Sequence, residues 1–358
     1  IFFKNSITIL FSVYLDKKQL TKSLVREKIA LVLISNTQFG KINIWILSKI
    51  MIWSGFMSKI LSSIIIPVHN QALRLDITLM SLVPQVNSST EIIVVDDGST
   101  DNIKEIIEKY KDILPLKYKH QSNRGRAAAR NIGIMMSTGD IVLFLDADRP
   151  VANSWLGNHI QVHEMGKNII GIGDIREFYF SNLENKKDLI YKDIADDFKN
   201  LFKFSRVYPY WNFVLKGFNQ NGICELNNPW SATLVGNMSL RRELLEETGL
   251  FDENFTGWGF EHFELGYRLF RIAGAKYMTV KNATNFHLSH PRTTNFYQES
   301  IIKSHSYFYE KYNDDTIFIL KDLLNGKLSL GNYDLVAGNG KSKIFYDTQN
   351  VFYKSLSL

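Results

Sequence analysis

The sequence predicts an α/β protein with a mostly parallel central sheet, helices on both faces of that sheet and helical extensions at both ends. From residue 62 onward, short continuous apolar runs alternate with segments of helical periodicity, a pattern typical of parallel strands buried on both faces. The 358 residues are 45% hydrophobic and 22% charged, which gives enough apolar surface for a large core. The length fits two domains, or one large domain with extensions.

Four strands and three helices are expected in the first half. Apolar runs predict strands at residues 64–68, 91–95 and 141–145, and residues 116–119 also resemble a strand. Helical periodicity predicts helices at residues 73–82, 102–111 and 126–136. This alternation indicates a Rossmann-like sheet, in which ligands bind at the carboxyl ends of the strands.

The alternation of apolar runs and helical segments becomes less regular after Pro150. Residues 176–230 show no sustained period, which favours a substrate-binding loop region or a small helical insertion. Helical patterns return at 241–247 and 261–272, a strand is expected at 277–280, and the chain after Pro291 reads as mostly helical.

Residues 1–60 differ from the rest of the chain in their residue pattern, because apolar patches are separated by lysines and polar residues. The apolar run at 42–57 carries Lys49 in its middle, whereas a membrane-spanning helix needs about 20 largely uncharged residues. We therefore expect an amphipathic or buried helix that touches a bilayer surface, with a spanning anchor as the alternative. The expected organisation is an N-terminal extension (1–60), a main domain (61–291, with halves 61–150 and 151–291) and a helical tail (292–358).

Charge and cysteine content narrow the function classes. The net charge of +6 is too small for a dedicated nucleic-acid binder and fits anionic substrates or an anionic membrane surface. The single cysteine, Cys224, cannot form an internal disulfide, and no cysteine–histidine cluster suggests zinc. These features indicate a reducing compartment and no nucleic-acid partner.

Two carboxylates follow the strand predicted at 141–145. Asp146 and Asp148 are separated by Ala147, and alternate residues of an extended chain face the same way, so both could address one ligand. Oxygen donors of this kind hold hard divalent cations that bridge phosphates. The alternative is a turn at the strand end with solvated acids.

Polar groups also follow the first two strands. Asp96 and Asp97 end the second strand, where they could hold a base N–H or a ribose hydroxyl. Pro67, His69 and Asn70 end the first strand at the same edge of the predicted sheet. Three strand ends therefore converge on one site.

Arginines and a glycine mark the next helix start. Gly125 frees the backbone before the helix, and Arg126 and Arg130, four residues apart, share a helix face that suits anionic phosphates. The alternative is that Ala127, Ala128 and Ala129 permit tight helix packing while the arginines neutralise the acids at the strand ends.

In order and spacing, these four motifs resemble the nucleotide-sugar half of family 2 glycosyltransferases with the GT-A fold. The resemblance implies that Pro67, Asp97 and either His69 or Asn70 line the nucleoside pocket. It also implies that Asp148 reaches a Mn²⁺ or Mg²⁺ ion on the diphosphate of a UDP-sugar. We expect the donor site to be completed by Asp96, Arg126, Arg130, Asp146 and Ala147.

The segment Gly257-Trp258-Gly259-Phe260-Glu261-His262-Phe263-Glu264 resembles the acceptor region of β-1,4-galactosyltransferases and bacterial chondroitin-type polymerases. Those families usually carry Glu-Asp where this chain has Glu261-His262, with the aspartate as catalytic base. Histidine, with an ordinary pKa of ~6.5, is also a competent base. We expect Glu261 and His262 jointly near the acceptor hydroxyl, with Glu264 as an alternative. Acceptor contacts are expected from Asn237, Trp258, Gly259 and Glu261.

Two histidines three residues apart, His287 and His290, follow the strand predicted at 277–280. The related families place a metal-ligating side chain at this distance beyond the Gly-Trp-Gly motif, so the resemblance implies that one of the two joins Asp148 on the metal. Spacing alone does not choose between them.

We therefore expect a metal-dependent glycosyltransferase that moves a hexosyl or N-acetylhexosaminyl group from a UDP-sugar to a hydroxyl of a glycan or glycolipid, with inversion. The enzyme is expected in the cytoplasm, peripheral on the inner face of the membrane. The alternatives are a retaining transferase and a catalytically silent nucleotide-sugar-binding module. A nucleotidyltransferase is disfavoured, because no glycine-rich phosphate loop with a following lysine occurs.

Overall fold

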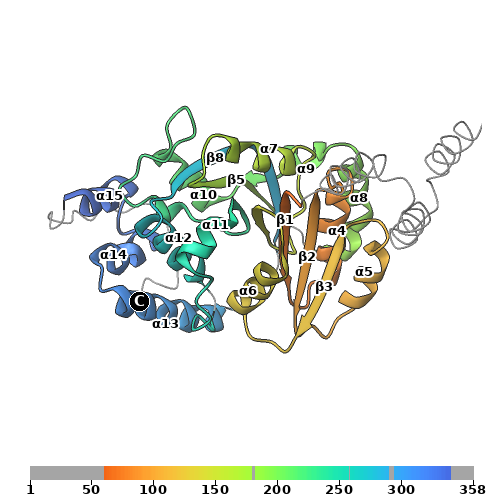
Figure 1. Cartoon of the computed structure of the whole chain (residues 1–358), viewed down its shortest axis with the longest axis horizontal. Coiled ribbons are helices and arrows are strands. Elements are labelled where there is room, and N and C mark those ends of the chain that lie inside the picture. The colour runs from red at the N-terminus through yellow and green to blue at the C-terminus, as the bar shows by residue number, and fades with distance from the viewer. Residues whose placement is uncertain (1–59, 180–181, 258, 290–293, 340–358) are drawn as a thin grey trace, which may run out of the picture. The chain divides into compact units, whose positions relative to one another are not determined.

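The structure is a computed structural model that describes residues 60–179, 182–257, 259–289 and 294–339. Its centre is an eight-stranded sheet with the order β3-β2-β1-β4-β7-β5-β6, and β8 pairs with β5 (Figure 1). β1 to β4 are parallel to one another, β7 is antiparallel to its neighbours β4 and β5, and β5 and β8 are parallel. The strands are β1 (Ser62–Val68), β2 (Thr90–Asp97), β3 (Leu116–Gln121), β4 (Ile141–Leu145), β5 (Ile169–Phe178), β6 (Arg206–Val207), β7 (Asn237–Arg241) and β8 (Lys276–Leu288).

Helices flank this sheet and extend beyond it. The first-half helices are α4 (Ala72–Leu82), α5 (Ile103–Tyr110), α6 (Arg126–Met136) and α7 (Trp155–Gln161). They are followed by α8 (Lys187–Ala195), α9 (Lys199–Phe204), α10 (Pro209–Val214), α11 (Arg242–Thr248) and α12 (Glu261–Arg271). The last three are α13 (Thr294–Tyr312), α14 (Asp315–Leu324) and α15 (Leu330–Asn339). The predicted α/β class with a mostly parallel sheet is confirmed.

The first half forms as the apolar runs predict. All four strands and all three helices expected between residues 62 and 145 are present, with ends displaced by at most two residues. Neighbouring residues of β1 enter different cores: Ile64 and Ile66 pack with α4 and α5, whereas Ile65 packs toward α6. Both faces of the strand are therefore buried, which explains why its sequence is continuously apolar rather than alternating.

The second half contains three strands that the pattern did not predict, β5, β6 and β7. In β5, Gly171 and Gly173 interrupt the apolar run, and a Cβ at Gly173 would lie 2.3 Å from the carbonyl oxygen of Ala283. Glycine here allows β8 to approach closely, although it weakens the strand signal. β7 carries buried polar side chains, and β8 continues well past the predicted strand at 277–280, so His287 lies inside the strand rather than after it.

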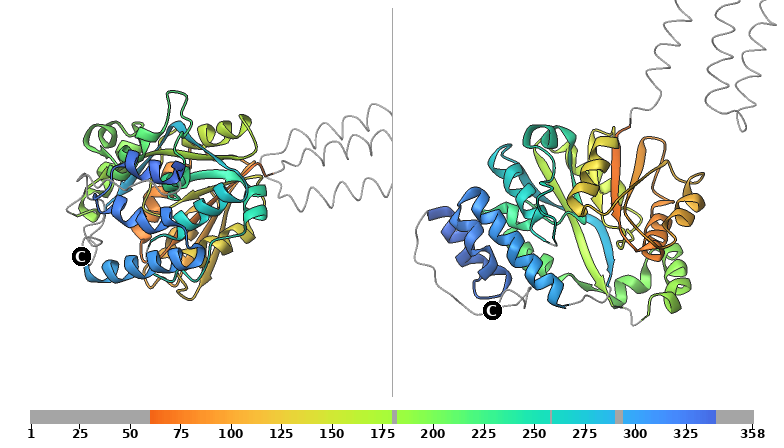
Figure 2. Two further views of the ribbon diagram at one scale, coloured as in Figure 1. Left: turned by 90° about the vertical axis from the view of Figure 1, so that its left-hand side faces the viewer. Right: turned by 90° about the horizontal axis from the view of Figure 1, so that it is seen from below.

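The helices after residue 293 share the main hydrophobic core. Ile301, Phe308 and Leu320 belong to the same buried cluster as Trp230 and Phe263 of the preceding chain. Figures 1 and 2 show α13, α14 and α15 gathered beside α12, on the side of the sheet away from α4 and α5. The predicted helical character of this region is confirmed up to residue 339, where the description ends.

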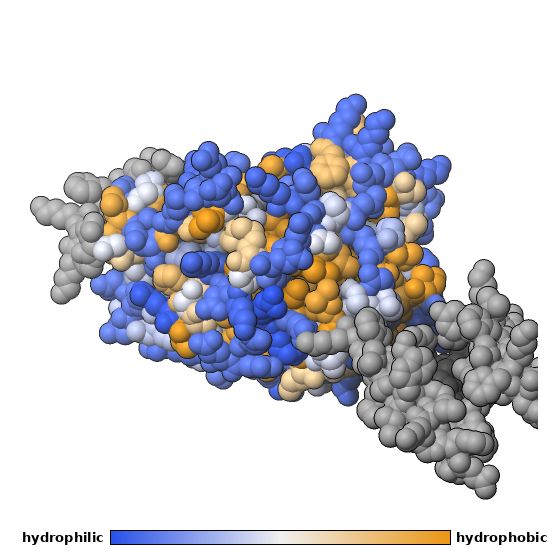
Figure 3. Space-filling view, turned by 45° about the horizontal axis from the view of Figure 1, so that its top comes forward, coloured by the Kyte–Doolittle hydropathy of each residue, from blue (hydrophilic) through white to orange (hydrophobic). Residues whose placement is uncertain are grey.

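The amphipathic helix predicted within residues 1–60 lies outside the described residues, apart from Ile60. Within the described ranges, none of the helices combines the length and the apolar character required to cross a bilayer. On the face drawn in Figure 3, most of the coloured surface is hydrophilic, with apolar side chains in smaller patches.

Candidate active site

Two neighbouring cavities lie at the carboxyl ends of β1, β2 and β4. The larger one, of about 440 Å³, is lined by residues that include Pro67, His69, Asp97, Asn123 and Ala147. The smaller one, of about 100 Å³, is lined among others by Gly259, Glu261, His262, Phe263 and His287. Both cavities are lined by Arg126, Asp146 and Asp148. These three residues therefore form the common wall, where a ligand that extends from one cavity to the other would pass.

Asp97 shapes the loop that precedes α6. Its Oδ1 accepts hydrogen bonds from the Gln121 side chain (2.7 Å) and the Arg124 backbone (2.8 Å), and its Oδ2 accepts one from the Gly125 backbone (2.9 Å). Gly125 has φ +90°, a left-handed conformation that favours glycine. The carboxylate thus fixes the turn that places Arg126 at the helix start, and it also lines the larger cavity.

The neighbouring polar residues brace the same edge. Asp96 accepts hydrogen bonds from the Ser99 backbone and the Tyr118 hydroxyl, both at 2.8 Å, and the amide oxygen of Asn70 accepts one from the Thr100 backbone at 2.8 Å. Neither Asp96 nor Asn70 is among the residues that line the two cavities, whereas His69 is. The structure therefore places His69 at the larger cavity and Asn70 in its supporting loop.

Arg126 and Arg130 have different surroundings, although they share a helix. Arg126 is exposed and lines both cavities. Arg130 is buried, with one guanidinium nitrogen 3.0 Å from Asp146 and another 3.0 Å from Glu261. Burial opposes its charge, but the two carboxylates outweigh burial and keep the pKa of Arg130 above its ordinary value. Arg130 therefore joins the end of β4 to the start of α12.

Glu261 and His262 begin α12 and both line the smaller cavity. Burial alone would raise the pKa of Glu261, but the imidazole of His262, with Nδ1 3.8 Å from the carboxylate, and the charge of Arg130 lower it well below its ordinary value. A carboxylate with so low a pKa is a weak proton acceptor. Of the two residues expected as the base, Glu261 is therefore the weaker proton acceptor, and both line the smaller cavity.

Asp148 and His287 form the candidate metal pair. The Nε2 of His287 lies 3.5 Å from Asp148 Oδ2, and its Nδ1 lies 3.4 Å from Glu177 Oε1. Burial lowers the pKa of His287, but the two carboxylates outweigh it, and the net shift is upward. Within the described ranges, no group of three or more His, Cys, Asp and Glu side chains is arranged to hold a metal ion. One carboxylate and one imidazole fit a Mn²⁺ or Mg²⁺ ion that takes its remaining ligands from a diphosphate and water.

Of the residues expected to contact the acceptor, some line the smaller cavity and others do not. Gly259 lines the smaller cavity, while Trp258 and His290 lie outside the described residues. Asn237 has no exposed surface: its oxygen accepts from Trp155 Nε1 at 2.6 Å, and its nitrogen donates to the carbonyls of Asp174 and Ala283. Both the oxygen and the nitrogen of this amide therefore form hydrogen bonds inside the fold.

Sequence reasoning missed several residues of the site, four of which carry charged or phenolic side chains. Arg149, Tyr208 and Tyr210 line the smaller cavity, and Glu177 contacts His287. Arg149 follows the acidic pair directly, and its Nε lies 3.2 Å from Asp146, so its position beside that motif was the available signal. The tyrosines come from the region 176–230, where no periodic pattern separates site residues from core residues.

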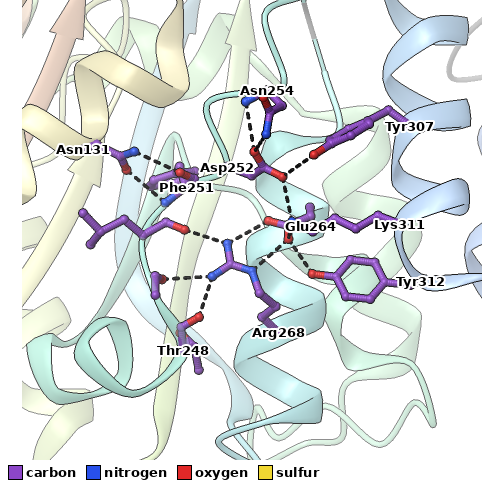
Figure 4. Close-up of polar contacts among 12 residues, drawn as sticks. Asn131, Thr248, Phe251, Asp252, Asn254, Glu264, Arg268, Tyr307, Lys311 and Tyr312 are labelled. Atoms are coloured by element: carbon purple, nitrogen blue, oxygen red, sulfur yellow. Dashed lines mark hydrogen bonds and ion pairs between the residues drawn. The ribbon is translucent and has the colours of Figure 1, made fainter.

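A buried polar network holds α12 against the rest of the fold (Figure 4). The fully buried carboxylate of Glu264 receives two hydrogen bonds from Arg268, at 2.8 and 2.7 Å, one from Lys311 at 2.8 Å and one from Tyr312 at 2.6 Å. Lys311 also donates to Asp252 at 2.7 Å. The helix that begins with Glu261 and His262 is thereby fixed to α13 one turn below the site.

The loop that contains Asp252 also ties this network to α6. The backbone of Phe251 exchanges two hydrogen bonds with the side chain of Asn131, both at 2.9 Å. Asn131 follows Arg130 on α6, and Asp252 follows Phe251 in the loop. The helix that carries the two arginines and the helix that carries His262 are therefore held through one connecting segment.

The chain is similar in sequence to known glycosyltransferases. Residues 63–249, more than half of the chain, match the family described as glycosyl transferase family 2. The chain is 28% identical to the uncharacterized glycosyltransferase YfnE of Bacillus subtilis over 289 residues, which cover 71% of each protein. It is 31% identical to the chondroitin synthase of Escherichia coli over 246 residues, which cover 65% of this chain and 35% of the synthase.

Among solved structures, S. aureus TarS 1–349 in complex with UDP-GlcNAc aligns with 74% of this chain and 72% of that chain, with 19% identity and a TM-score of 0.49. The sequence match, rather than this structural similarity, shows to which family the chain belongs. The predicted resemblance is confirmed, and the chain belongs to glycosyl transferase family 2 and is a glycosyltransferase.

Proposed function

We propose that the protein transfers a sugar from a UDP-sugar to a hydroxyl acceptor, with a divalent cation and with inversion at the anomeric carbon. The observation that carries the proposal is the common wall of the two cavities, formed by Arg126, Asp146 and Asp148. The nucleoside would occupy the larger cavity and the transferred sugar the smaller one, so that the diphosphate crosses this wall.

Asp148 and His287 would hold the cation, Mn²⁺ or Mg²⁺, together with oxygens of the diphosphate. The bound cation would offset the negative charge that develops on the departing nucleotide. Arg126, exposed at the start of α6, would contact the same phosphates. Arg130, which also lines the smaller cavity, would keep Asp146 and Glu261 in place.

His262 would act as the general base. Its Nδ1 lies on the side of Glu261, which leaves Nε2 to take the proton of the acceptor hydroxyl. The hydroxyl oxygen forms the new bond to the anomeric carbon while the bond to the diphosphate oxygen breaks on the opposite face, which inverts the configuration. The ionised Glu261 would stabilise the imidazolium that results.

The acceptor is proposed to be a glycan or a glycolipid. The likeness to a chondroitin synthase, a polysaccharide-forming enzyme by its name, supports this class. A cytoplasmic position with contact to the inner membrane surface through residues 1–60 stays part of the proposal, and it is supported by the apolar and lysine-containing texture of that segment.

A donor panel tests the proposal. Hydrolysis and transfer from several nucleotide sugars are measured with Mn²⁺ for the wild type, for Asp148→Ala and for His262→Ala. Asp112→Ala, which changes an exposed carboxylate outside the cavities, serves as the matched control. We expect both site variants to lose turnover and the control to keep it, and NMR of the product should show inversion. Equal turnover in the wild type and Asp148→Ala would contradict the metal site.

A further inference from the structure

Glu177 is a buried carboxylate beside the candidate metal pair that the proposed function does not use. β5 and β8 pair in parallel, and their register makes Glu177 and His287 direct partners. Directly paired residues of adjacent strands place their side chains on the same face of the sheet. The contact between Glu177 Oε1 and His287 Nδ1, at 3.4 Å, is therefore fixed by the backbone of the central sheet.

The rest of the Glu177 carboxylate is also held. Its Oε2 accepts a hydrogen bond of 2.7 Å from the hydroxyl of Tyr179, which in turn receives one of 2.7 Å from Arg206. Arg206 itself lies 3.7 Å from Glu177 and its side chain is 62% exposed, so this ion pair alone contributes little. A buried carboxylate is costly unless it is paired and hydrogen-bonded, and here the imidazole is its nearest buried partner.

We propose that Glu177 is a positioning residue that accepts the Nδ1–H of His287 and thereby directs Nε2 toward Asp148, where the cation would bind. An imidazole that binds a metal through one nitrogen commonly donates its other N–H to a carboxylate, which fixes the tautomer and the ring orientation. Tyr179 holds the carboxylate in turn. This inference rests on the proposed function, because it assigns a supporting residue to the same cation site.

The test measures Mn²⁺ binding rather than turnover. Full-length protein with UDP is titrated with Mn²⁺, and the free ion is followed by EPR. We expect Glu177→Ala to weaken Mn²⁺ binding by about 10- to 100-fold. Glu177→Gln should weaken it less, because the amide oxygen still accepts the Nδ1–H. Pulsed EPR should detect nitrogen coupling to Mn²⁺ in the wild type, and this coupling should be diminished in Glu177→Ala.

The matched control is Glu91→Gln, which alters a buried carboxylate of β2 that lines neither cavity. It should leave Mn²⁺ affinity unchanged, and thermal unfolding of every variant verifies that it is folded. Two further variants, Asp148→Ala and His287→Ala, separate the two proposals. If they lose Mn²⁺ while both Glu177 variants bind within twofold of the wild type, the role of Glu177 is wrong and the cation site stands. If Asp148→Ala and His287→Ala also bind like the wild type, the cation site itself is wrong.

Discussion

Replacing Glu264 with glutamine should weaken the attachment of α13 to α12. The change keeps the size of the side chain and removes a fully buried negative charge that faces Arg268, Lys311 and Tyr312. Removing one partner of a buried ion pair typically costs about 3–5 kcal/mol. Arg268 keeps the carbonyls of residues 248–250 and Lys311 keeps Asp252, so we expect a loss near the lower end, about 3 kcal/mol.

The assay is denaturant unfolding together with a thermal scan. A loss of about 3 kcal/mol corresponds to a decrease in Tm of about 4 °C for a chain of 358 residues, because the unfolding entropy is about 2.1 cal/mol/K per residue. Glu246→Gln, an exposed carboxylate on the adjacent α11, is the control and should change stability by less than about 0.5 kcal/mol. The double variant Glu264→Gln/Arg268→Met should lose less than the sum of the single changes, because it removes both charges. A loss below about 1 kcal/mol for Glu264→Gln would refute the idea that this network fixes the two helices.

Three further changes have defined outcomes. Burial holds the pKa of His159 at about 4 and that of His163 at about 3, below the ordinary ~6.5, so their contribution to stability is present above pH 6.5 and is lost as the pH falls toward 4. Below pH 6.5, unfolding free energies should fall by up to about 1.4 kcal/mol per pH unit for each imidazole, and His163→Gln should reduce the slope; an unchanged slope would contradict this. Arg126→Ala should raise the KM for the donor with little change in Tm, whereas Arg130→Ala should lower Tm by breaking two buried ion pairs, and the reverse outcome would exchange their assigned roles. Gly173→Ala should lower Tm, because a Cβ there would lie 2.3 Å from a carbonyl oxygen of β8; an unchanged Tm would show that the strands can separate at that point.

The first half of the fold could be predicted because most of its strands consist of consecutive buried apolar residues. β1, β2 and β4 are covered on both faces, so their runs stand out in the sequence. β7 does not follow this rule, since Asn237 and Ser239 are buried against the side chains of His159 and His163 and no apolar run marks the strand. Such a polar interior depends on partners that are distant in the chain.

The same distinction applies to the site. Asp148 and His287 were expected from motifs, whereas Glu177 reaches His287 only through the register of β5 with β8, which no local pattern encodes. The environment of Glu261 depends on both near and distant residues. Its pKa is lowered first by the adjacent His262 and then by Arg130, an ion-pair partner 131 residues away in the sequence.

The core that the C-terminal helices share with the rest of the fold shows that the end of the family match is not the end of the folded unit. The family match ends at residue 249, yet Ile301, Phe308 and Leu320 fill the same interior as Trp230 and Phe263. A protein cut after residue 249 would lose α12, which carries His262 and Glu264, as well as α13, and it would expose the core residue Trp230 to water. The family match is therefore shorter than the stretch that shares one core, and it ends before α12, the helix that carries the candidate base.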